Sequence, residues 1–368
     1  MKRKIAFVGN SALTMINFRM GVMRELAKEH EVVMIAPEDC ALTPLKGTHI
    51  RFVPIHIDCK GTNPIHDMRL YRELKAIYSR EQFDFIYHFT IKPVIYGSLA
   101  AGALRIRHIS VVTGLGYTFI KRNWLFRVSC LLHRVALRKA VQVWFLNQDD
   151  HDCFVSLHLV HPDKAHVIPG EGVDTDYYIS KHPMPEKFTF IYIGRMLRYK
   201  GVELYVQAAE RLRGDYPDVC WQLLGPYDMN DPDGITPNEM EQWVQKGWVE
   251  YLGVSKDVRP VIEQCSCSVL ASYFREGVPR SLMEAASMER PIITTDSVGC
   301  RDVVENGVNG LLCQPNSVES LEETMRQMLE MTAEQRIEMG KRGRERMQQK
   351  FDLKKIIEEY QNSLNTAC

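Results

Sequence analysis

The sequence predicts an α/β protein of two doubly wound domains. Apolar strand-like runs alternate with amphipathic helical segments, and this pattern starts anew near residue 188. The length of 368 residues suits two domains of ordinary size. Charge also separates the halves: residues 1–180 hold 23 Lys and Arg against 17 Asp and Glu, and residues 181–368 hold 23 against 29.

The first half contains five β-rich apolar runs with helical segments between most of them. Strands are expected at residues 4–9, 31–37, 49–55, 83–89 and 108–114, and helices at 17–29, 67–81 and 94–104. Such alternation favours βαβ units and therefore a parallel sheet. A polar, proline-containing stretch, SKHPMPEK at 180–187, marks the junction. We place the domains at residues 1–172 and 173–351.

The second half repeats the pattern. Strands are expected at 188–195, 220–225, 248–253, 266–272, 290–296 and 310–313. Helices are expected at 201–213, 257–265 and 280–288, from near 300–305, from Ser317, and again after Lys350. Two such domains create a cleft, and ligands of these sheets bind at the carboxyl ends of the strands.

Several functional classes are disfavoured. Neither first strand is followed by GxGxxG, and no GxxxxGK[ST] loop occurs, so a nicotinamide dehydrogenase and a phosphate-loop NTPase are not expected. The ten cysteines are scattered, and the CxC of Cys265 and Cys267 has no partner pair at zinc spacing. We expect a reducing compartment, no metal site and no membrane-spanning helix.

The segment GRMLRYKG (194–201) is the first candidate for binding a ligand. It follows a strand and opens a helix, so Arg195 and Lys200 would place two cations beside a helix N-terminus. This arrangement suits a diphosphate, which gains negative charge as it leaves. The plainer interpretation is a strand end with solvated basic side chains.

The segment REGVPRSLMEAA (275–286) is the second candidate. Glu276 lies on a loop after a strand, Pro279 stands where a helix can begin, and Glu284 follows about one turn inside that helix. Backbone amides at Val278, Arg280 and Ser281 could face a phosphate. The alternative is an N-capping glutamate and a surface glutamate of an ordinary helix.

In the form EGxPRSLxEA, the two glutamates resemble glycosyltransferase family 4, the retaining enzymes of the GT-B fold. GRMLRYKGVE, VIPGEGVDTDYY, LLGPYD, YLGVSKDV and PIITTDSVGCRDVVENGVNGLLC agree with it. The resemblance covers nearly the whole chain and is strongest between 167 and 315. It implies two Rossmann-like domains facing a central cleft and a last helix, 352–368, that crosses back onto the N-terminal domain.

The resemblance also implies roles for single residues. Glu284 would bind the donor ribose, Glu276 would contact hydroxyls of the transferred sugar, and Arg195 and Lys200 would hold the diphosphate. The segment 251–258 would line the base pocket. The predicted catalytic residues are Glu276, Arg195 and Lys200. The predicted donor-binding residues are Glu284, Gly194, Gly277, Val278, Pro279, Arg280, Ser281, Gly253 and Val254.

The N-terminal half resembles a narrower bacterial group that extends undecaprenyl-diphosphate-linked sugars, through HFTIKPVIYGSLAA (88–101) and VVTGLGYTF (111–119). Many family members carry a histidine where this chain has Thr113-Gly114, and the narrower group shares the departure. It leaves open which atom contacts the primary hydroxyl of the sugar. The residues expected to face the acceptor and the cleft are Gly9, Asn10, Asn17, Arg19, Lys92, Thr113 and Gly114.

The segment 121–140 is expected to form a cationic amphipathic helix. Leu125, Val128, Leu132 and Val135 fall on one face and Arg127, Arg134 and Arg138 on another, with Trp124 and Phe126 at its start. Between Asp84 and Asp149 the chain has nine Lys and Arg and no acidic residue. The hypothesis is contact with anionic lipid; the alternative is a core helix with a solvated basic face.

These observations predict a retaining glycosyltransferase. It would move a hexose or N-acetylhexosamine from a UDP-sugar to an undecaprenyl-diphosphate-linked saccharide in bacterial surface polysaccharide synthesis, on the cytoplasmic face of the membrane. No cofactor, no metal and no nucleic-acid partner is expected. The alternatives are a UDP-sugar epimerase or hydrolase on the same fold, and a protein that only senses the nucleotide-sugar.

Overall fold

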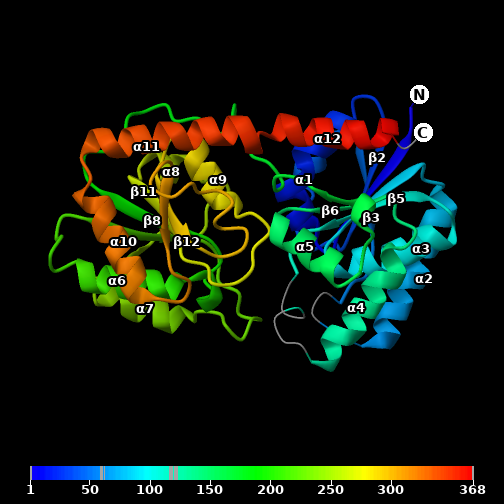
Figure 1. Cartoon of the computed structure of the whole chain (residues 1–368), viewed down its shortest axis with the longest axis horizontal. Helices are drawn as coiled ribbons and strands as arrows, with labels where there is room; N and C mark the ends of the chain where they lie inside the picture. The colour runs from blue at the N-terminus through cyan, green and yellow to red at the C-terminus, as the bar shows by residue number, and fades with distance from the viewer. Residues whose placement is uncertain (1, 59–60, 62, 116–118, 120–122, 367–368) are drawn as a thin grey trace. The chain divides into compact units, whose positions relative to one another are not determined.

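The computed structural model describes residues 2–58, 61, 63–115, 119 and 123–366 (Figure 1). The chain divides into two compact units. Unit 1 comprises Met1–Glu171 and Leu353–Cys368, and unit 2 comprises Gly172–Asp352. Each unit has a parallel sheet covered by helices, so the predicted α/β class with two Rossmann-like domains is confirmed.

Unit 1 is built on a seven-stranded parallel sheet in the order β3-β2-β1-β4-β5-β6-β7. Its inner strands are mostly apolar and, apart from their first residues in β2 and β5, buried, as expected of parallel strands covered on both faces. The strands are β1 Lys4–Val8, β2 Glu31–Ala36, β3 Ile50–Pro54, β4 Phe85–Phe89, β5 Arg107–Val112, β6 Gln142–Phe145 and β7 Ala165–Val167. The helices are α1 Ala12–Leu26, α2 Pro64–Glu81, α3 Ser98–Ala103, α4 Trp124–Leu137, α5 Gln148–Ser156 and α12 Leu353–Thr366.

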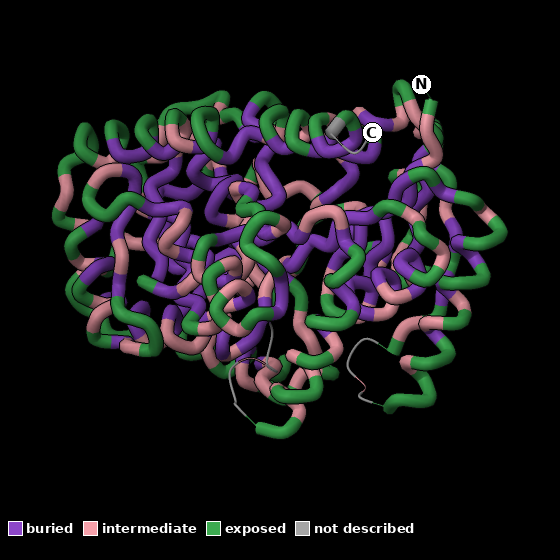
Figure 2. The backbone as a smooth tube through the Cα atoms, turned by 45° about the vertical axis from the view of Figure 1, so that its right-hand side comes forward, coloured by how far each residue is buried: buried purple, intermediate pink, exposed green. Residues whose placement is uncertain are grey.

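Unit 2 has a six-stranded parallel sheet in the order β10-β9-β8-β11-β12-β13. Its strands are β8 Thr189–Ile193, β9 Cys220–Leu224, β10 Glu250–Tyr251, β11 Cys267–Leu270, β12 Ile292–Thr295 and β13 Gly310–Cys313. Its helices are α6 Val202–Leu212, α7 Pro237–Gln245, α8 Arg259–Glu263, α9 Arg280–Ser287, α10 Val318–Glu330 and α11 Ala333–Arg346. Figure 2 shows the chain buried in the interior and exposed on the outer turns of the helices.

Both sheets reverse their winding direction beside their first strand. The reversal lies between β1 and β4 in unit 1 and between β8 and β11 in unit 2. Loops that leave the carboxyl ends of these neighbouring strands turn to opposite faces of the sheet and open a crevice between them. This crevice is the expected ligand site of each unit.

The last helix belongs to unit 1 through an aromatic cluster. Tyr360 of α12 is buried against Tyr87 of β4 and Trp144 of β6, with ring centroids 4.8 and 4.9 Å away. The Tyr87 hydroxyl also hydrogen-bonds Ser363 at 2.7 Å. Residues 367 and 368 of the predicted helix 352–368 lie outside the described part of the chain.

Several predicted element boundaries are wrong. The helix α1 begins five residues earlier than expected, at Ala12, because the Ser11 side chain caps it by accepting from Thr14 N. The helix predicted near 300–305 is a turn, and Gly299 before it has a φ of +82°. The helix expected from Ser317 ends at Glu330, and a capping box at Thr332 starts another.

The predicted helix 94–104 is a π-helical turn at Pro93–Gly97 followed by the short α3. Across the described residues, no helix combines the length and apolarity needed to cross a membrane.

Candidate active site

Two loops of unit 2 meet at its winding reversal. The loop 194–201 leaves β8 and the loop 271–279 leaves β11, and these strands are hydrogen-bonded neighbours. Gly201 has a φ of +81°, and a Cβ there would lie 2.1 Å from the Ala271 carbonyl oxygen. The close approach of the loops therefore requires glycine at 201.

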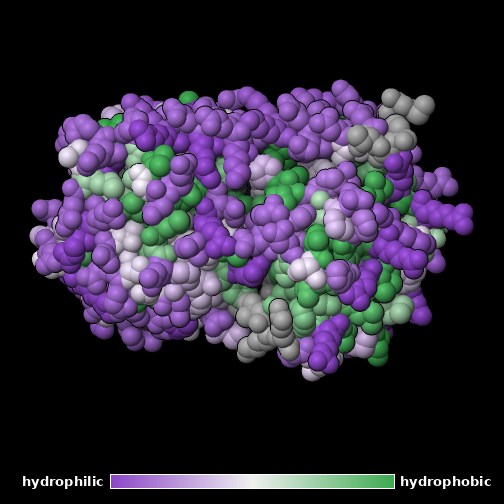
Figure 3. Space-filling model, viewed as in Figure 1, coloured by the Kyte–Doolittle hydropathy of each residue, from purple (hydrophilic) through white to green (hydrophobic). Residues whose placement is uncertain are grey.

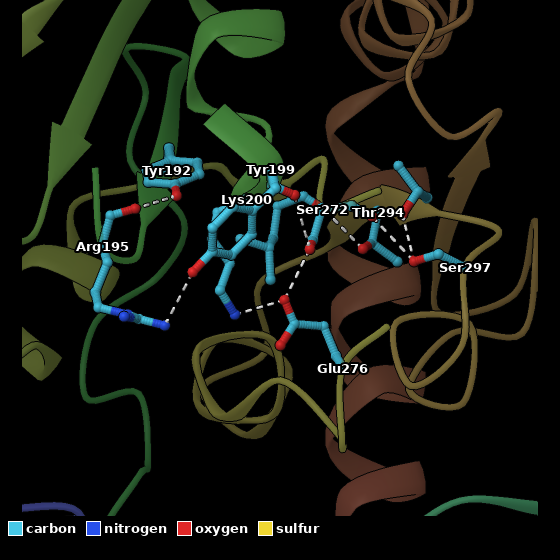
Figure 4. A network of polar contacts seen from close by, with 10 residues as sticks. Tyr192, Arg195, Tyr199, Lys200, Ser272, Glu276, Thr294 and Ser297 are labelled. Atoms are coloured by element: carbon cyan, nitrogen blue, oxygen red, sulfur yellow. Dashed lines mark hydrogen bonds and ion pairs between the residues drawn. The ribbon is translucent and has the colours of Figure 1, made fainter. Parts of the chain in front are cut away.

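Lys200 and Glu276 are joined directly, although 76 residues separate them in sequence. Lys200 Nζ lies 2.5 Å from Glu276 Oε1, and the Ser272 hydroxyl donates to the same oxygen at 2.7 Å. Both charged side chains are largely buried, with exposed fractions of 19% and 13%. Figure 4 shows the carboxylate held between the lysine and the serine. A paired buried carboxylate of this kind has a fixed orientation.

Ser272 is itself fixed by the next strand. Its carbonyl oxygen accepts hydrogen bonds from the hydroxyls of Thr295, at the end of β12, and of Ser297. Ser272 is fully buried. The sequence did not single out this residue, which is the last residue of the predicted strand 266–272 and lies two positions beyond the end of β11.

The hydroxyl of Ser272 is expected to orient Glu276. Ser272→Ala should lower kcat about tenfold or more, because a hydrogen bond to a charged group contributes about 1.5–3 kcal/mol. The apparent KM for the donor should stay within threefold. Ser297→Ala is the matched control. It removes a hydroxyl that donates to the same Ser272 carbonyl, and no hydrogen bond between Ser297 and Glu276 is described. Equal losses of kcat in the two variants would mean that the effect is one of packing.

Arg195 lies at the rim of the same loop. Its backbone carbonyl accepts from the Tyr192 hydroxyl at 2.8 Å, which fixes the main chain beneath it. Its guanidinium is 48% exposed, 3.2 Å from Asp228 and 3.5 Å from the Tyr199 hydroxyl. Arg195 and Lys200 thus place two cations at one sheet edge, and Asp228 is a neighbour that the sequence did not reveal.

The helix α9 adds a third source of positive potential. It begins directly after Pro279, and its first-turn N–H groups have no acceptor within the helix. Gly299 lets the loop that enters it come close, because a Cβ there would lie 2.4 Å from the carbonyl oxygens of both Glu276 and Gly277. The predicted residues Val278 and Ser281 flank this helix start.

Glu284 lies one turn further along α9 and has a different environment. It is only 8% exposed and accepts from Arg280 Nε at 2.8 Å. Burial raises the pKa of Glu284, and the Arg280 guanidinium opposes that rise. Asp257, in the predicted base-binding segment, is near enough to influence the same carboxyl. In that segment Val254 is exposed and Gly253 has a φ of +75°.

The predicted N-terminal residues follow the ends of three adjacent strands of unit 1. Gly9 and Asn10 follow β1, Lys92 lies beyond β4, and Thr113 and Gly114 follow β5. A Cβ at Gly9 would lie 2.5 Å from the sulfur of Met15, so a larger residue there would have to displace that side chain. Asn17 on α1 is exposed. Residues 116–118 of the motif 111–119 lie outside the described part of the chain.

Arg19 and Lys92 are each engaged by an acidic side chain. Arg19 is 3% exposed, forms an ion pair with Glu171 and lies over the ring of Phe89. Lys92 Nζ lies 2.7 Å from Asp67. Arg19 is therefore a buried residue of unit 1, which the sequence did not indicate.

The described residues contain no cluster of three or more His, Cys, Asp or Glu that could hold a metal ion. Cys265 and Cys267 are fully buried free thiols, and burial raises the pKa of Cys265 to about 12. They therefore serve as apolar core residues.

Known proteins share both halves of this architecture. Residues 4–147 match the family model described as glycosyl transferase 4-like, and residues 187–331 match the model described as glycosyl transferases group 1. The N,N'-diacetylbacillosaminyl-diphospho-undecaprenol alpha-1,3-N-acetylgalactosaminyltransferase of Campylobacter jejuni is 25% identical over 346 residues, with 89% of each chain covered.

A second relative is the UDP-Gal:alpha-D-GlcNAc-diphosphoundecaprenol alpha-1,3-galactosyltransferase of Escherichia coli. It is 24% identical, with 80% of this chain and 78% of the relative covered. Among solved structures, HepE of Anabaena in complex with UDP-glucose superposes with a TM-score of 0.82 at 19% identity, over 99% of this chain and 100% of the other. This likeness shows the GT-B fold.

Proposed function

Because the chain belongs to the glycosyltransferases that combine a glycosyl transferase 4-like domain with a glycosyl transferase group 1 domain, we propose a specific transfer reaction for it. The chain would transfer a hexose or N-acetylhexosamine from a UDP-sugar to an undecaprenyl-diphosphate-linked saccharide. The reaction would be a step of bacterial surface polysaccharide or glycan synthesis. The observation that carries the proposal is that the Lys200–Glu276 ion pair and the Arg195 guanidinium lie on the two loops at the winding reversal of unit 2. The two relatives named above act on diphospho-undecaprenol-linked sugars, and HepE binds UDP-glucose.

In this proposal the charges of unit 2 serve the departure of UDP. The bond between the anomeric carbon and the diphosphate breaks, and negative charge develops on the β-phosphate. Lys200, Arg195 and the N-terminus of α9 would stabilise this charge without reorganising, because the loops already hold them. No divalent metal would be required, so an excess of EDTA should leave the rate within twofold.

Glu276 would stabilise the sugar rather than attack it. Its Oε1 already accepts from Lys200 and Ser272, an arrangement that suits a fixed negative charge better than a nucleophile. The transferred sugar would pass through an oxocarbenium-like state, and the acceptor hydroxyl would attack the face that UDP leaves. The anomeric configuration would then be retained.

Product analysis tests this function. The purified chain is incubated with each UDP-hexose and UDP-N-acetylhexosamine, with and without an undecaprenyl-diphosphate-linked saccharide, and UDP release and the mass of the lipid product are measured. We expect UDP release that depends on the acceptor. Interconversion of the donor without acceptor would identify an epimerase, free sugar a hydrolase, and binding without turnover a sensor.

Glu284 would bind the ribose of the donor. Glu284→Ala should weaken UDP binding by roughly tenfold to a hundredfold, because it removes a buried, charged hydrogen-bond partner. Isothermal titration with UDP gives the dissociation constant. Glu289→Ala, just beyond the same helix, is the control and should bind UDP normally; an unchanged Glu284→Ala variant would remove this residue from the donor site.

We also propose that unit 1 rests on the cytoplasmic face of the membrane through α4. Trp124, Val128, Leu131 and Val135 are all exposed, and their spacing places them on one stripe of the helix. His133 and Leu137 bury the opposite side. Figure 3 shows apolar side chains gathered where Figure 1 places α4.

The arginines of α4 strengthen this proposal. Arg127, Arg134 and Arg138 are exposed beside the stripe, and a cation near anionic lipid contributes about 1 kcal/mol. The predicted apolar face is corrected in detail: Leu125 and Leu132 are half-buried, whereas Trp124 and Leu131 are exposed. Residues 121 and 122 lie outside the described part of the chain.

Liposome sedimentation tests the role of α4. At low salt the chain should bind vesicles that contain anionic lipid, and binding should weaken as salt rises. Leu131→Glu should reduce binding at least tenfold, since it removes an exposed apolar side chain and adds a repelled charge. Ile337→Glu is matched, because Ile337 is also an exposed apolar residue on a helix, α11. Equal binding by both variants would contradict the assignment.

A further inference from the structure

Unit 1 has a small pocket at the carboxyl ends of β4 and β5. Thr90 lines it after β4, and Val112 and Thr113 line it at the end of β5. Phe119 and Phe154 close the apolar part of its wall, and His133 of α4 completes it. The pocket has room for one group of about the size of a water molecule or a methyl.

The backbone beside this pocket is unusual in two ways. Thr90 has a φ of +67°, a left-handed conformation that is rare and strained for a β-branched residue. Its hydroxyl donates to the Phe89 carbonyl. Three residues later the chain forms the π-helical turn at Pro93–Gly97, a feature found frequently at functional sites. Both features set the position of the pocket wall.

The polar groups of the wall suit an amide. Burial lowers the pKa of His133 to about 4, so the ring is neutral at pH 7. Its Nδ1 donates to the Ser129 carbonyl at 2.8 Å, which leaves Nε2 as an acceptor. The Thr90 hydroxyl, whose proton is donated to the Phe89 carbonyl, can accept, and the Thr113 hydroxyl can donate or accept. A methyl would fill the apolar space, and an adjoining N–H and C=O would meet these groups.

We infer that this pocket receives the acetamido group of an N-acetylated sugar at the acceptor's end, which rests on the proposed function and narrows its acceptor class. A hydroxyl in the same place would leave the apolar space unfilled. The acceptor sugars named for the two relatives, diacetylbacillosamine and GlcNAc, both carry such a group. Thr90, Thr113 and His133 are then residues that determine specificity.

The test compares two matched acceptors, undecaprenyl-diphosphate-linked GlcNAc and undecaprenyl-diphosphate-linked glucose, with a mixture of UDP-hexoses and UDP-N-acetylhexosamines. The wild-type chain should favour the GlcNAc acceptor in kcat/KM by roughly tenfold to 200-fold, as expected for one apolar group in a fitted pocket. Val112→Leu places one more methylene at the pocket and should reduce this preference to within threefold.

Two further variants separate specificity from folding. Val53→Leu makes the same change at a buried strand position outside the pocket, and it should keep the wild-type preference. Thr113→Val keeps the shape of the wall, removes a hydroxyl, and should lower the preference at least threefold. If Val112→Leu lowers Tm far more than Val53→Leu does, the acceptor preference of Thr113→Val decides whether the pocket sets specificity.

Transfer to both acceptors at equal wild-type rates would overturn the inference and leave the proposed function standing. A preference that survives both pocket variants would also overturn it. Transfer to neither acceptor would overturn the proposed function, and this inference with it.

Discussion

Glu276→Ala is expected to lower kcat by roughly a hundredfold to a thousandfold while UDP binds within threefold of wild type. The carboxylate lies between Lys200 and Ser272, where it would face the transferred sugar and not the nucleotide. An interaction made mainly in the transition state affects kcat rather than ground-state binding. Initial rates at saturating donor and acceptor measure the effect.

Two variants make this result interpretable. Glu276→Gln keeps the size and hydrogen-bonding capacity of the side chain, so a loss comparable to that of Glu276→Ala would identify the negative charge as the active property. Glu203→Ala removes a partly exposed glutamate that pairs with Arg198 in the same unit, and its kcat should stay near wild type. A Glu276→Ala enzyme with normal kcat would refute the proposed role.

Lys200→Met is expected to lower kcat/KM by roughly a hundredfold to a thousandfold, because it removes a cation that would stabilise the departing diphosphate. Methionine keeps most of the length of the stem, so loss of charge is the main change. The variant also leaves the buried Glu276 carboxylate without its ion-pair partner.

Steady-state kinetics and UDP titration together test this second expectation. Lys187→Met is the control, since Lys187 is an exposed lysine that precedes β8 of the same sheet. A variant that loses UDP affinity but keeps kcat would show that Lys200 only holds the nucleotide in the ground state.

The sequence was informative about strands and weak about their order. Largely apolar runs predicted β1, β2, β4 and β8, because parallel strands covered on both faces are mostly buried. The pairing of Lys200 with Glu276 depends on β8 lying beside β11, and no local pattern encodes that neighbourhood. The resemblance to a known family, and not the spacing of the residues, assigned Lys200 and Glu276 to parts of one ligand in advance.

Other parts of the site are tertiary effects that local patterns do not contain. The Ser272 hydroxyl donates to Glu276 from a main chain whose carbonyl Thr295 and Ser297 anchor from a neighbouring strand end. The segment 300–305 forms a turn and not the expected helix. Gly299, just before it, lies so close to the carbonyl oxygens of Glu276 and Gly277 that a Cβ there would clash with them. Arg19 was assigned to the acceptor side, and its burial against Glu171 could not be foreseen from α1 alone.

The account assigns Glu276 to the sugar and Glu284 to the nucleotide, and UDP titration into Glu276→Ala and Glu284→Ala side by side tests this division most directly. We predict a UDP dissociation constant within threefold of wild type for Glu276→Ala and one raised at least tenfold for Glu284→Ala. Equal losses of UDP affinity in the two variants would contradict it.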